Sequence, residues 1–392
     1  MKTYQDFVNE IFGNERVVIP NKYEGNNITG AFKYPFEYCT FKSLLYKRYS
    51  RLKEIYENTN YYEQLLVKIK EVSNHKKTIW YGAYAELVAY DILNLKGVIE
   101  PIALENSMSA VFSLAQYVYK SNRPNSNKSN VNLDGFIPEY EVYFDVKILA
   151  DSVSDILDKV INQALSKADI KKNDCNVLPE YDLVKNVFHY SKCVKDLEVE
   201  LAEELSNKKK PTCVKSQIVE NLSYRIKWEG GVNFREGCYD PYRNAEEMKD
   251  ALIFRYTNKF LINKPFFLVM VNFPWYNQLH NNSFDMNPVF YRSLARRTFM
   301  EYRHSELKMD EMLKIYDDDY SFCSSCTVYE VSRKLSGIVF IDDLSIEEDA
   351  YNCWIYINPN ADNKSPRIRS YFDELLRNAK DGIYDDFEYD NY

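Results

Sequence analysis

The stretch VNLDGFIPEYEVYFDVKIL (residues 131–149) contains two runs of strand-forming residues separated by a turn signal. Residues 131–137 and 141–149 form the two runs, and Pro138-Glu139-Tyr140 lies between them. Alternation of apolar and polar side chains is typical of a half-buried β-strand, and a short break between two such runs favours a hairpin. We therefore expect an antiparallel pair of strands here.

The second run of this hairpin carries acidic and basic side chains on one face. Because successive side chains of a strand point to opposite faces, Tyr143, Asp145 and Lys147 share a face. A hairpin loop with an even number of residues would place Asp134 opposite Tyr143 and diagonal to Asp145. Diagonal neighbours lie about 7–8 Å apart, and two carboxylates at that separation can bind one divalent cation between them.

A third carboxylate lies within an apolar helical stripe. Thr78 can cap a helix that runs to about Leu95. One face of this helix carries residues spaced by three and four, namely Ile79, Gly82, Ala83, Glu86, Ala89, Tyr90 and Leu93. A glutamate in such a stripe is costly unless it is paired, protonated or bound to metal. Gly82, one turn before Glu86, would let another backbone or a ligand approach closely. Glu86 is therefore a candidate site residue.

Taken in chain order, Glu86 on a helix, Asp134 in Leu-Asp-Gly, and Asp145-Val-Lys147 resemble the motif of the PD-(D/E)xK superfamily of restriction-endonuclease-like nucleases. The resemblance implies an α/β fold in which helices flank a mixed sheet. It also implies an endonuclease that hydrolyses phosphodiester bonds with Mg²⁺, or with Mn²⁺ in its place. On this resemblance Glu86, Asp134 and Asp145 are the metal ligands, and Lys147 is the catalytic lysine. Leu133 stands where the motif has proline.

The resemblance favours nucleic acid as the partner, with DNA favoured over RNA. A restriction or defence-like role follows from analogy to the family alone, and cutting both strands would imply a homodimer. Two other functions remain open: a non-catalytic nuclease-fold module that binds nucleic acid or a partner protein, and a structural interaction protein. The simplest alternative for Asp145 and Lys147 is an exposed ion pair, which contributes almost nothing to stability.

The chain divides into five predicted regions. They are a mainly helical N-terminal region (1–75), the first part of a nuclease core (76–150), a mostly helical or irregular insertion (151–243), the remainder of the core (244–380) and an acidic tail (381–392). Hydrophobic periodicity further predicts helices at 41–72, 244–261, 288–303 and 370–380, and strands at 265–273, 337–341 and 353–357.

Two groups of basic residues are candidate nucleic-acid contacts. Lys208, Lys209 and Lys210 begin a basic segment that continues to residue 227, and Arg292 and Arg296 share one side of a predicted helix. Either group could follow a phosphate backbone, although a solvated surface is the alternative. Because the acidic tail contains no basic residue, we hypothesise that it occupies the basic groove when nucleic acid is absent.

The composition is ordinary for a soluble globular protein, with 392 residues, 45% hydrophobic, 28% charged and a net charge of −8. We expect a cytoplasmic protein without a membrane partner, because the sequence shows no membrane-length apolar run and no secretory signal. A nucleotide-binding P-loop is not expected, because no Gly-x-x-x-x-Gly-Lys-Ser/Thr sequence occurs. Cys323 and Cys326, with His304 and Cys353, form a minor candidate zinc site.

Overall fold

The computed structural model describes most of the chain in separate segments. The described residues are 6, 9–11, 39–72, 77–94, 100–101, 108–109, 119–121, 130–131, 133–149, 152–171, 174–181, 187–207, 211–219, 222–228, 240–260, 264–273, 286–309, 311, 320–322, 326–343, 351–376 and 382–387.

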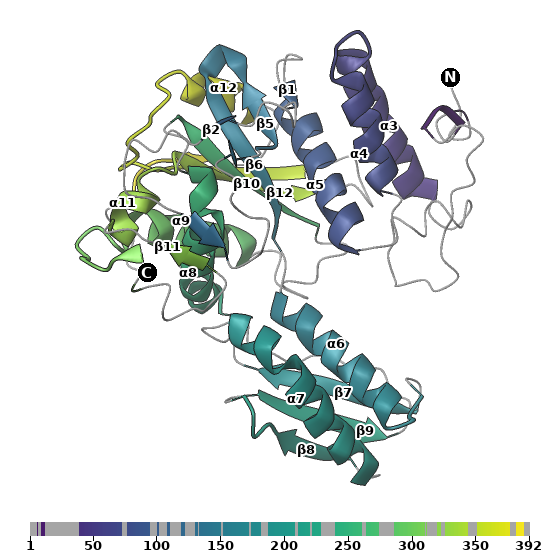
Figure 1. The fold of residues 1–392 in the computed structure, drawn as a ribbon. Coiled ribbons are helices and arrows are strands. Elements are labelled where there is room, and N and C mark those ends of the chain that lie inside the picture. The colour runs from purple at the N-terminus through teal and green to yellow at the C-terminus, as the bar shows by residue number, and fades with distance from the viewer. Residues whose placement is uncertain are drawn as a thin grey trace.

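The central element of the described residues is a seven-stranded mixed sheet with the order β1-β5-β6-β10-β12-β13-β14 (Figure 1). Its strands are β1 (Glu100–Pro101), β5 (Gly135–Ile137), β6 (Val142–Ile148), β10 (Phe266–Asn272), β12 (Gly337–Asp343), β13 (Tyr351–Ile357) and β14 (Ile383–Tyr384). The β6, β10 and β12 strands run parallel, whereas β5 and β13 pair antiparallel with β6 and β12. The expected class, an α/β fold with a mixed sheet flanked by helices, is therefore confirmed.

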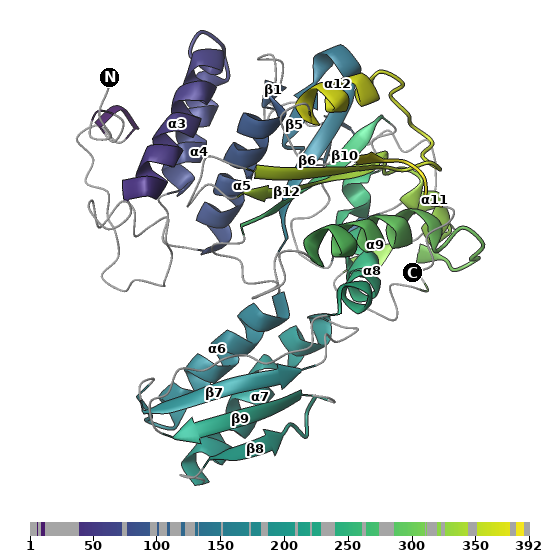
Figure 2. The ribbon, with the colours of Figure 1, turned by 180° about the vertical axis from the view of Figure 1, so that it is seen from behind.

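The two central strands, β10 and β12, are buried along their whole length. Near-continuous apolar runs are typical of parallel strands that are covered on both faces. Here one face packs against helices on the N-terminal side of the chain and α12 (Ile368–Leu375). The other face packs against α8 (Pro241–Phe260), α9 (Asn287–Met300) and α11 (Val328–Ser332). Figure 2 shows this layering from behind.

The N-terminal helices are α3 (Cys39–Tyr56), α4 (Tyr62–Val72) and α5 (Lys77–Leu93). The prediction of one continuous helix over 41–72 is wrong, because the chain turns between α3 and α4. At this turn the Thr59 hydroxyl donates to the Tyr56 carbonyl at 2.8 Å, which satisfies an acceptor at the helix end. The helix predicted from Thr78 corresponds to α5, which packs on β6 and β10.

Within the predicted insertion of residues 151–243, the described elements from Ser152 to Trp228 form a separate lobe with its own apolar core (Figures 1 and 2). Its elements are α6 (Ser152–Lys167), β7 (Cys175–Tyr181), α7 (Val187–Asn207), β8 (Thr212–Lys215) and β9 (Leu222–Trp228). The strands form an antiparallel sheet of order β7-β9-β8, which was absent from the expectation of mostly helical or irregular structure. The sequence did not indicate these strands, because charged side chains on one face of the sheet make the strand segments polar overall.

The C-terminal segment is part of the fold rather than only an acidic tail. Its residues 383–384 form β14 beside β13, and Phe387 is 1% exposed within the core cluster on the α9 side. The region predicted as a tail therefore contributes a strand and an apolar anchor. Residues 388–392 lie outside the described residues.

Two further strand pairs and a short helix complete the described elements. The pairs are β2 (Met108–Ser109) with β4 (Asn130–Val131), and β3 (Tyr119–Ser121) with β11 (Tyr320–Phe322). The short helix is η1 (Pro138–Tyr140), which connects β5 to β6. None of the described helices has both the length and the apolar composition needed to cross a bilayer.

Candidate functional site

The β5–β6 hairpin places Asp134 differently from the expected register. Phe136 pairs with Tyr143 and Gly135 pairs with Phe144, so Asp134 is not opposite Tyr143. The pairing ends at Gly135 opposite Phe144, and the Asp134 N–H donates to the Phe144 carbonyl, so Asp134 lies just beyond the regular ladder at the edge of β6. The hairpin prediction is confirmed, but its register was wrong because the connection comprises η1 and a left-handed Glu141 (φ 50°), which shifts the pairing.

Asp134 is held in place at the edge of β6 by backbone contacts. Its carboxylate Oδ2 accepts the Val146 N–H at 2.8 Å, and its own N–H donates to the Phe144 carbonyl at 3.1 Å. The Tyr90 hydroxyl on α5 donates to the Asp134 carbonyl at 2.6 Å. The sheet therefore holds the Asp134 carboxylate, and the helix that carries Glu86 holds the Asp134 backbone.

The glycine of Leu-Asp-Gly has a packing role beside this carboxylate. A Cβ atom at Gly135 would overlap the ring of Phe144. Phe144 is buried in the core on the α5 face of the sheet. The close approach of strand and ring therefore requires glycine after Asp134.

Lys147 lies between two carboxylates of the hairpin. Its ammonium forms an ion pair with Asp145 and lies 3.7 Å from Asp134 Oδ2. It also donates to the Val146 carbonyl at 2.9 Å. Asp145 is completely buried, while the Lys147 side chain remains 25% exposed. The structure therefore brings together three of the four predicted catalytic residues, with the amine open to solvent on one side.

Glu86 forms an ion pair with a lysine that the sequence analysis did not single out. Its Oε2 lies 2.9 Å from the ammonium of Lys68 on α4, and Lys68 also pairs with Glu71 at 3.1 Å. Within the described ranges, no group of three or more His, Cys, Asp or Glu side chains could hold one metal ion. Asp134 and Asp145 are the carboxylates that the structure places together, and Glu86 as a third ligand stays a prediction.

Electrostatic coupling nevertheless links Glu86 to the hairpin. Burial raises the pKa of Asp134 well above its ordinary value, and the nearby carboxylates of Asp145 and Glu86 raise it further, against the effect of Lys147. Burial also raises the pKa of Glu86, while Lys68 and Lys147 oppose that rise. The site thus concentrates negative charge that protons or cations would neutralise.

Gly82 lies one turn before Glu86 on α5, and the structure leaves space beside it. A Cβ atom built there meets nothing within 4 Å among the described residues. Within the described residues, no other backbone therefore approaches Gly82 closely, and the approach of a ligand there stays a prediction.

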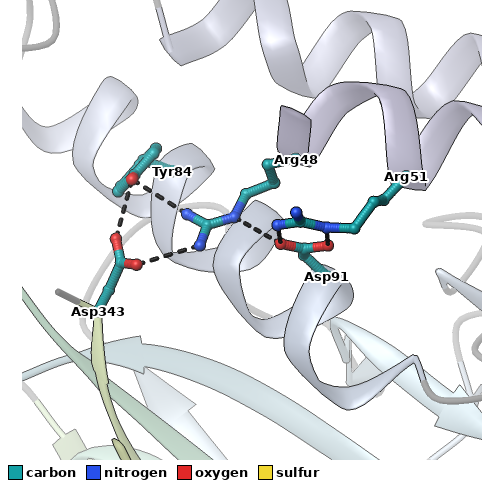
Figure 3. Close-up of polar contacts among 5 residues, drawn as sticks. All are labelled: Arg48, Arg51, Tyr84, Asp91 and Asp343. Carbon is teal, nitrogen blue, oxygen red and sulfur yellow. Dashed lines mark hydrogen bonds and ion pairs between the residues drawn. The ribbon is translucent and has the colours of Figure 1, made fainter. Parts of the chain in front are cut away.

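A buried ion network fixes α5 against the sheet (Figure 3). Arg48 on α3 donates to Asp91 at 2.8 Å and to Tyr84 at 3.0 Å, both on α5, and to Asp343 at the end of β12 at 3.1 Å. Arg51 also binds Asp91, at 2.6 Å. Because Tyr84 and Asp91 flank Glu86 in sequence, the network sets the position of the helix that carries Glu86.

Several of these residues were missed by the sequence argument. Lys68 and Arg48 lie on helices whose faces look like ordinary amphipathic surfaces, and their partners are distant in the chain. The glycine and tyrosine neighbours of the site carried a detectable signal: Gly135 follows Asp134 directly, and Tyr90 lies one turn after Glu86. A sequence pattern of this kind shows where a residue lies along a helix or strand, but not which distant residue it contacts.

Of the five predicted nucleic-acid contacts, the structure describes Arg292 and Arg296. Lys208, Lys209 and Lys210 lie outside the described residues. Arg292 on α9 donates to the Asp386 carbonyl at 3.2 Å, and its guanidinium lies 5.1 Å and 5.4 Å from the ring centroids of Tyr384 and Phe387. Arg296 is partly exposed one turn further along α9. The C-terminal segment therefore covers Arg292.

The candidate zinc site is not assembled among the residues that the structure describes. Cys326 and Cys353 are both buried but belong to core clusters on opposite faces of the sheet, so they cannot bind the same ion. His304 is exposed, and Cys323 lies outside the described residues.

Comparison with known proteins adds no assignment. No family model matches the chain, and no curated protein or solved structure is significantly similar to it.

Proposed function

We propose that this chain is a Mg²⁺-dependent endonuclease of the restriction-endonuclease-like kind, acting on nucleic acid and preferentially on DNA. The observation that carries the proposal is the placement of Lys147 between the carboxylates of Asp134 and Asp145, at the end of the β5–β6 hairpin away from its turn. An exposed surface pair would not have a completely buried aspartate as one partner.

The donor chemistry of this site fits a hard divalent cation. Mg²⁺ is commonly bound by one or two carboxylates, with water and substrate phosphate completing its coordination. Asp134 and Asp145 would be these carboxylates, and Glu86 would be an accessory ligand or a base. When bound, the cation would supply positive charge to the scissile phosphate.

The remaining chemistry belongs to side chains of the chain itself. Lys147 is partly exposed and would hold a phosphate oxygen or orient the attacking water once a cation replaces it at the aspartates. Glu86, whose pKa burial raises, is suited to hold a proton more tightly than an exposed glutamate does. Tyr90 and the Val146 N–H keep Asp134 in one position throughout.

The experiment is incubation with linear duplex, circular duplex and single-stranded DNA, and with RNA, each with and without Mg²⁺. Wild type is compared with Asp134→Ala, Lys147→Ala and the control Lys167→Ala, in which a surface pair with Glu198 is lost. We expect cleavage only with Mg²⁺, at least about 100-fold slower in the two site variants and unchanged in the control. Cleavage that persists in both site variants would place the active site elsewhere.

A non-catalytic nucleic-acid-binding module is the second candidate. Two observations favour it: the described residues contain no group of three potential metal ligands, and Lys68 forms an ion pair with Glu86. The two candidates differ in metal response: only the enzyme requires divalent cations to bind at Asp145. Binding of DNA without any Mg²⁺-dependent cleavage or stabilisation would favour the module.

A further inference from the structure

The sheet of the inserted lobe has one covered face and one open face. Residues such as Val177, Val214 and Ile226 point into the lobe core, where α6 and α7 contribute the other side. Figures 1 and 2 show both helices on the same side of β7, β9 and β8. Because side chains alternate along each strand, the residues between those core positions form the open face.

The open face is predominantly basic. It carries Lys215 on β8, and Arg225 and Lys227 on β9, with Glu180 on β7 as its acidic member within the described strands. Lys215 and Lys227 are exposed, and the Arg225 side chain is 43% exposed while forming an ion pair with Glu180. Three bases against one acid leave this face with a charge of +2.

The two sides of the lobe differ in net charge, since α6 carries two acids and two lysines and α7 is net acidic. Helix α7, on the other side of the sheet, contains five acids and two lysines: Asp196, Glu198, Glu200, Glu203, Glu204, Lys192 and Lys195. Solvation alone does not require positive charges to gather on one face. The whole chain carries a net charge of −8. A basic sheet face in an acidic protein is complementary to a polyanion.

The connection of the lobe relates this face to the proposed active site. The lobe begins at Ser152, and the chain reaches it directly from β6, the strand that carries Asp145 and Lys147. A nucleic acid bound by the lobe would therefore be held by the part of the chain that directly follows the catalytic strand. We propose that the open face of the lobe sheet, formed by Lys215, Arg225 and Lys227, binds the phosphate backbone of nucleic acid without sequence preference.

The choice of nucleic acid as the polyanion rests on the proposed function, but the test does not depend on cleavage. Binding of a duplex DNA of about three helical turns is measured by fluorescence anisotropy in EDTA, with the Asp145→Asn variant as background. The triple variant Lys215→Gln, Arg225→Gln, Lys227→Gln is compared with a control triple variant on the helices of the same lobe. The control, Lys159→Gln, Lys167→Gln and Lys195→Gln, removes the same charge from the other side of the lobe.

We expect the open-face variant to bind at least tenfold more weakly near 100 mM salt. Its plot of log affinity against log salt should be flatter by about two to three, because each lost phosphate contact removes about 0.9 from the slope. The control should change affinity less than twofold. Equal losses in the two triple variants would overturn the inference, and so would an absence of DNA binding by the Asp145→Asn background at low salt.

A second measurement uses Cys213, an exposed free thiol on β8 that pairs with Arg225 across the sheet. Its alkylation, followed by mass spectrometry of the peptide, should slow several-fold in saturating DNA and keep its rate in saturating poly-glutamate. Protection by poly-glutamate alone would assign the face to an acidic protein and overturn the inference. A chain that shows these effects but never cleaves would overturn the proposed function and leave this inference standing.

Discussion

The ammonium of Lys147 lies 3.7 Å from Oδ2 of Asp134, although 13 residues separate them in the chain. The same ammonium pairs with the buried Asp145, so two carboxylates of the hairpin share one lysine. This arrangement has consequences for stability, pH dependence and metal binding that can each be measured.

Metal binding should stabilise the folded chain through Asp145. If Mg²⁺ or Mn²⁺ binds the folded state alone, a concentration 100 times Kd adds about 2.7 kcal/mol, which raises Tm by several degrees. Asp145→Asn should abolish this rise because a carboxylate ligand is lost. Thermal unfolding with and without each cation measures the effect. A rise of equal size in the variant would show that the cation binds elsewhere.

The pKa of Asp134 should make stability fall as pH rises. Burial beside Asp145 and Glu86 raises this pKa in the folded state, so the folded protein binds the proton more tightly than the unfolded chain. The resulting stabilisation is complete below the ordinary pKa of about 3.9 and is lost as pH rises through the folded value.

Asp134→Asn removes that titration while keeping an oxygen to accept the Val146 N–H. Its Tm should therefore decline less than that of wild type between about pH 4 and pH 8. Thermal unfolding across this range, without divalent cations, gives the comparison. A variant whose stability relative to wild type decreases with rising pH would contradict the shift.

Loss of Lys68 should be costly because Glu86 would then be a mostly buried carboxylate without its ion pair. Lys68→Met is expected to lower the free energy of unfolding by about 1–3 kcal/mol at neutral pH. Adding Glu86→Gln should recover most of that loss, since the uncompensated charge is gone. Denaturant unfolding of both single variants and the double variant measures the coupling. Additive single effects would argue against the pair.

Two glycines near the site should respond in opposite directions to alanine. Gly135→Ala should destabilise by about 1–3 kcal/mol, because the new Cβ overlaps Phe144. Gly82→Ala should stabilise by about 0.5–1 kcal/mol, because it lies within α5 beside open space. Chemical denaturation measures the stability of both variants, and each variant serves as the control for the other. Similar losses at both positions would contradict the packing described.

We expect the C-terminal segment to contribute to the stability of the fold, and this contribution must be separated from any effect on nucleic-acid binding. Phe387→Ala is expected to cost about 3–5 kcal/mol because the ring is buried in the core, so deleting residues 381–392 would confound a binding test. The hypothesis that acids of this segment compete with nucleic acid near Arg292 is better tested by Asp385→Asn with Asp386→Asn. That variant should bind DNA more tightly at low salt, and an unchanged salt-dependent binding curve would refute the competition.

Much of the central fold could be predicted from local sequence. The apolar runs that form β10 and β12, and the alternating pattern of β6, indicated their strands because burial determines which side chains a strand tolerates. The helix carrying Glu86 was evident from its periodicity. The break between α3 and α4 and the strands of the lobe were missed, because a polar turn and a charged sheet face carry weak local signals.

The sequence by itself determined which residues could form the candidate site: Glu86, Asp134, Asp145 and Lys147 were identifiable from their chemical types and from the elements that carry them. Only the tertiary structure decided their partners, placing Lys147 between Asp134 and Asp145, and Glu86 against Lys68. The physical reason is that strand and helix periodicity depend on neighbouring residues, whereas ion pairs depend on how distant segments pack. No local pattern specifies that packing.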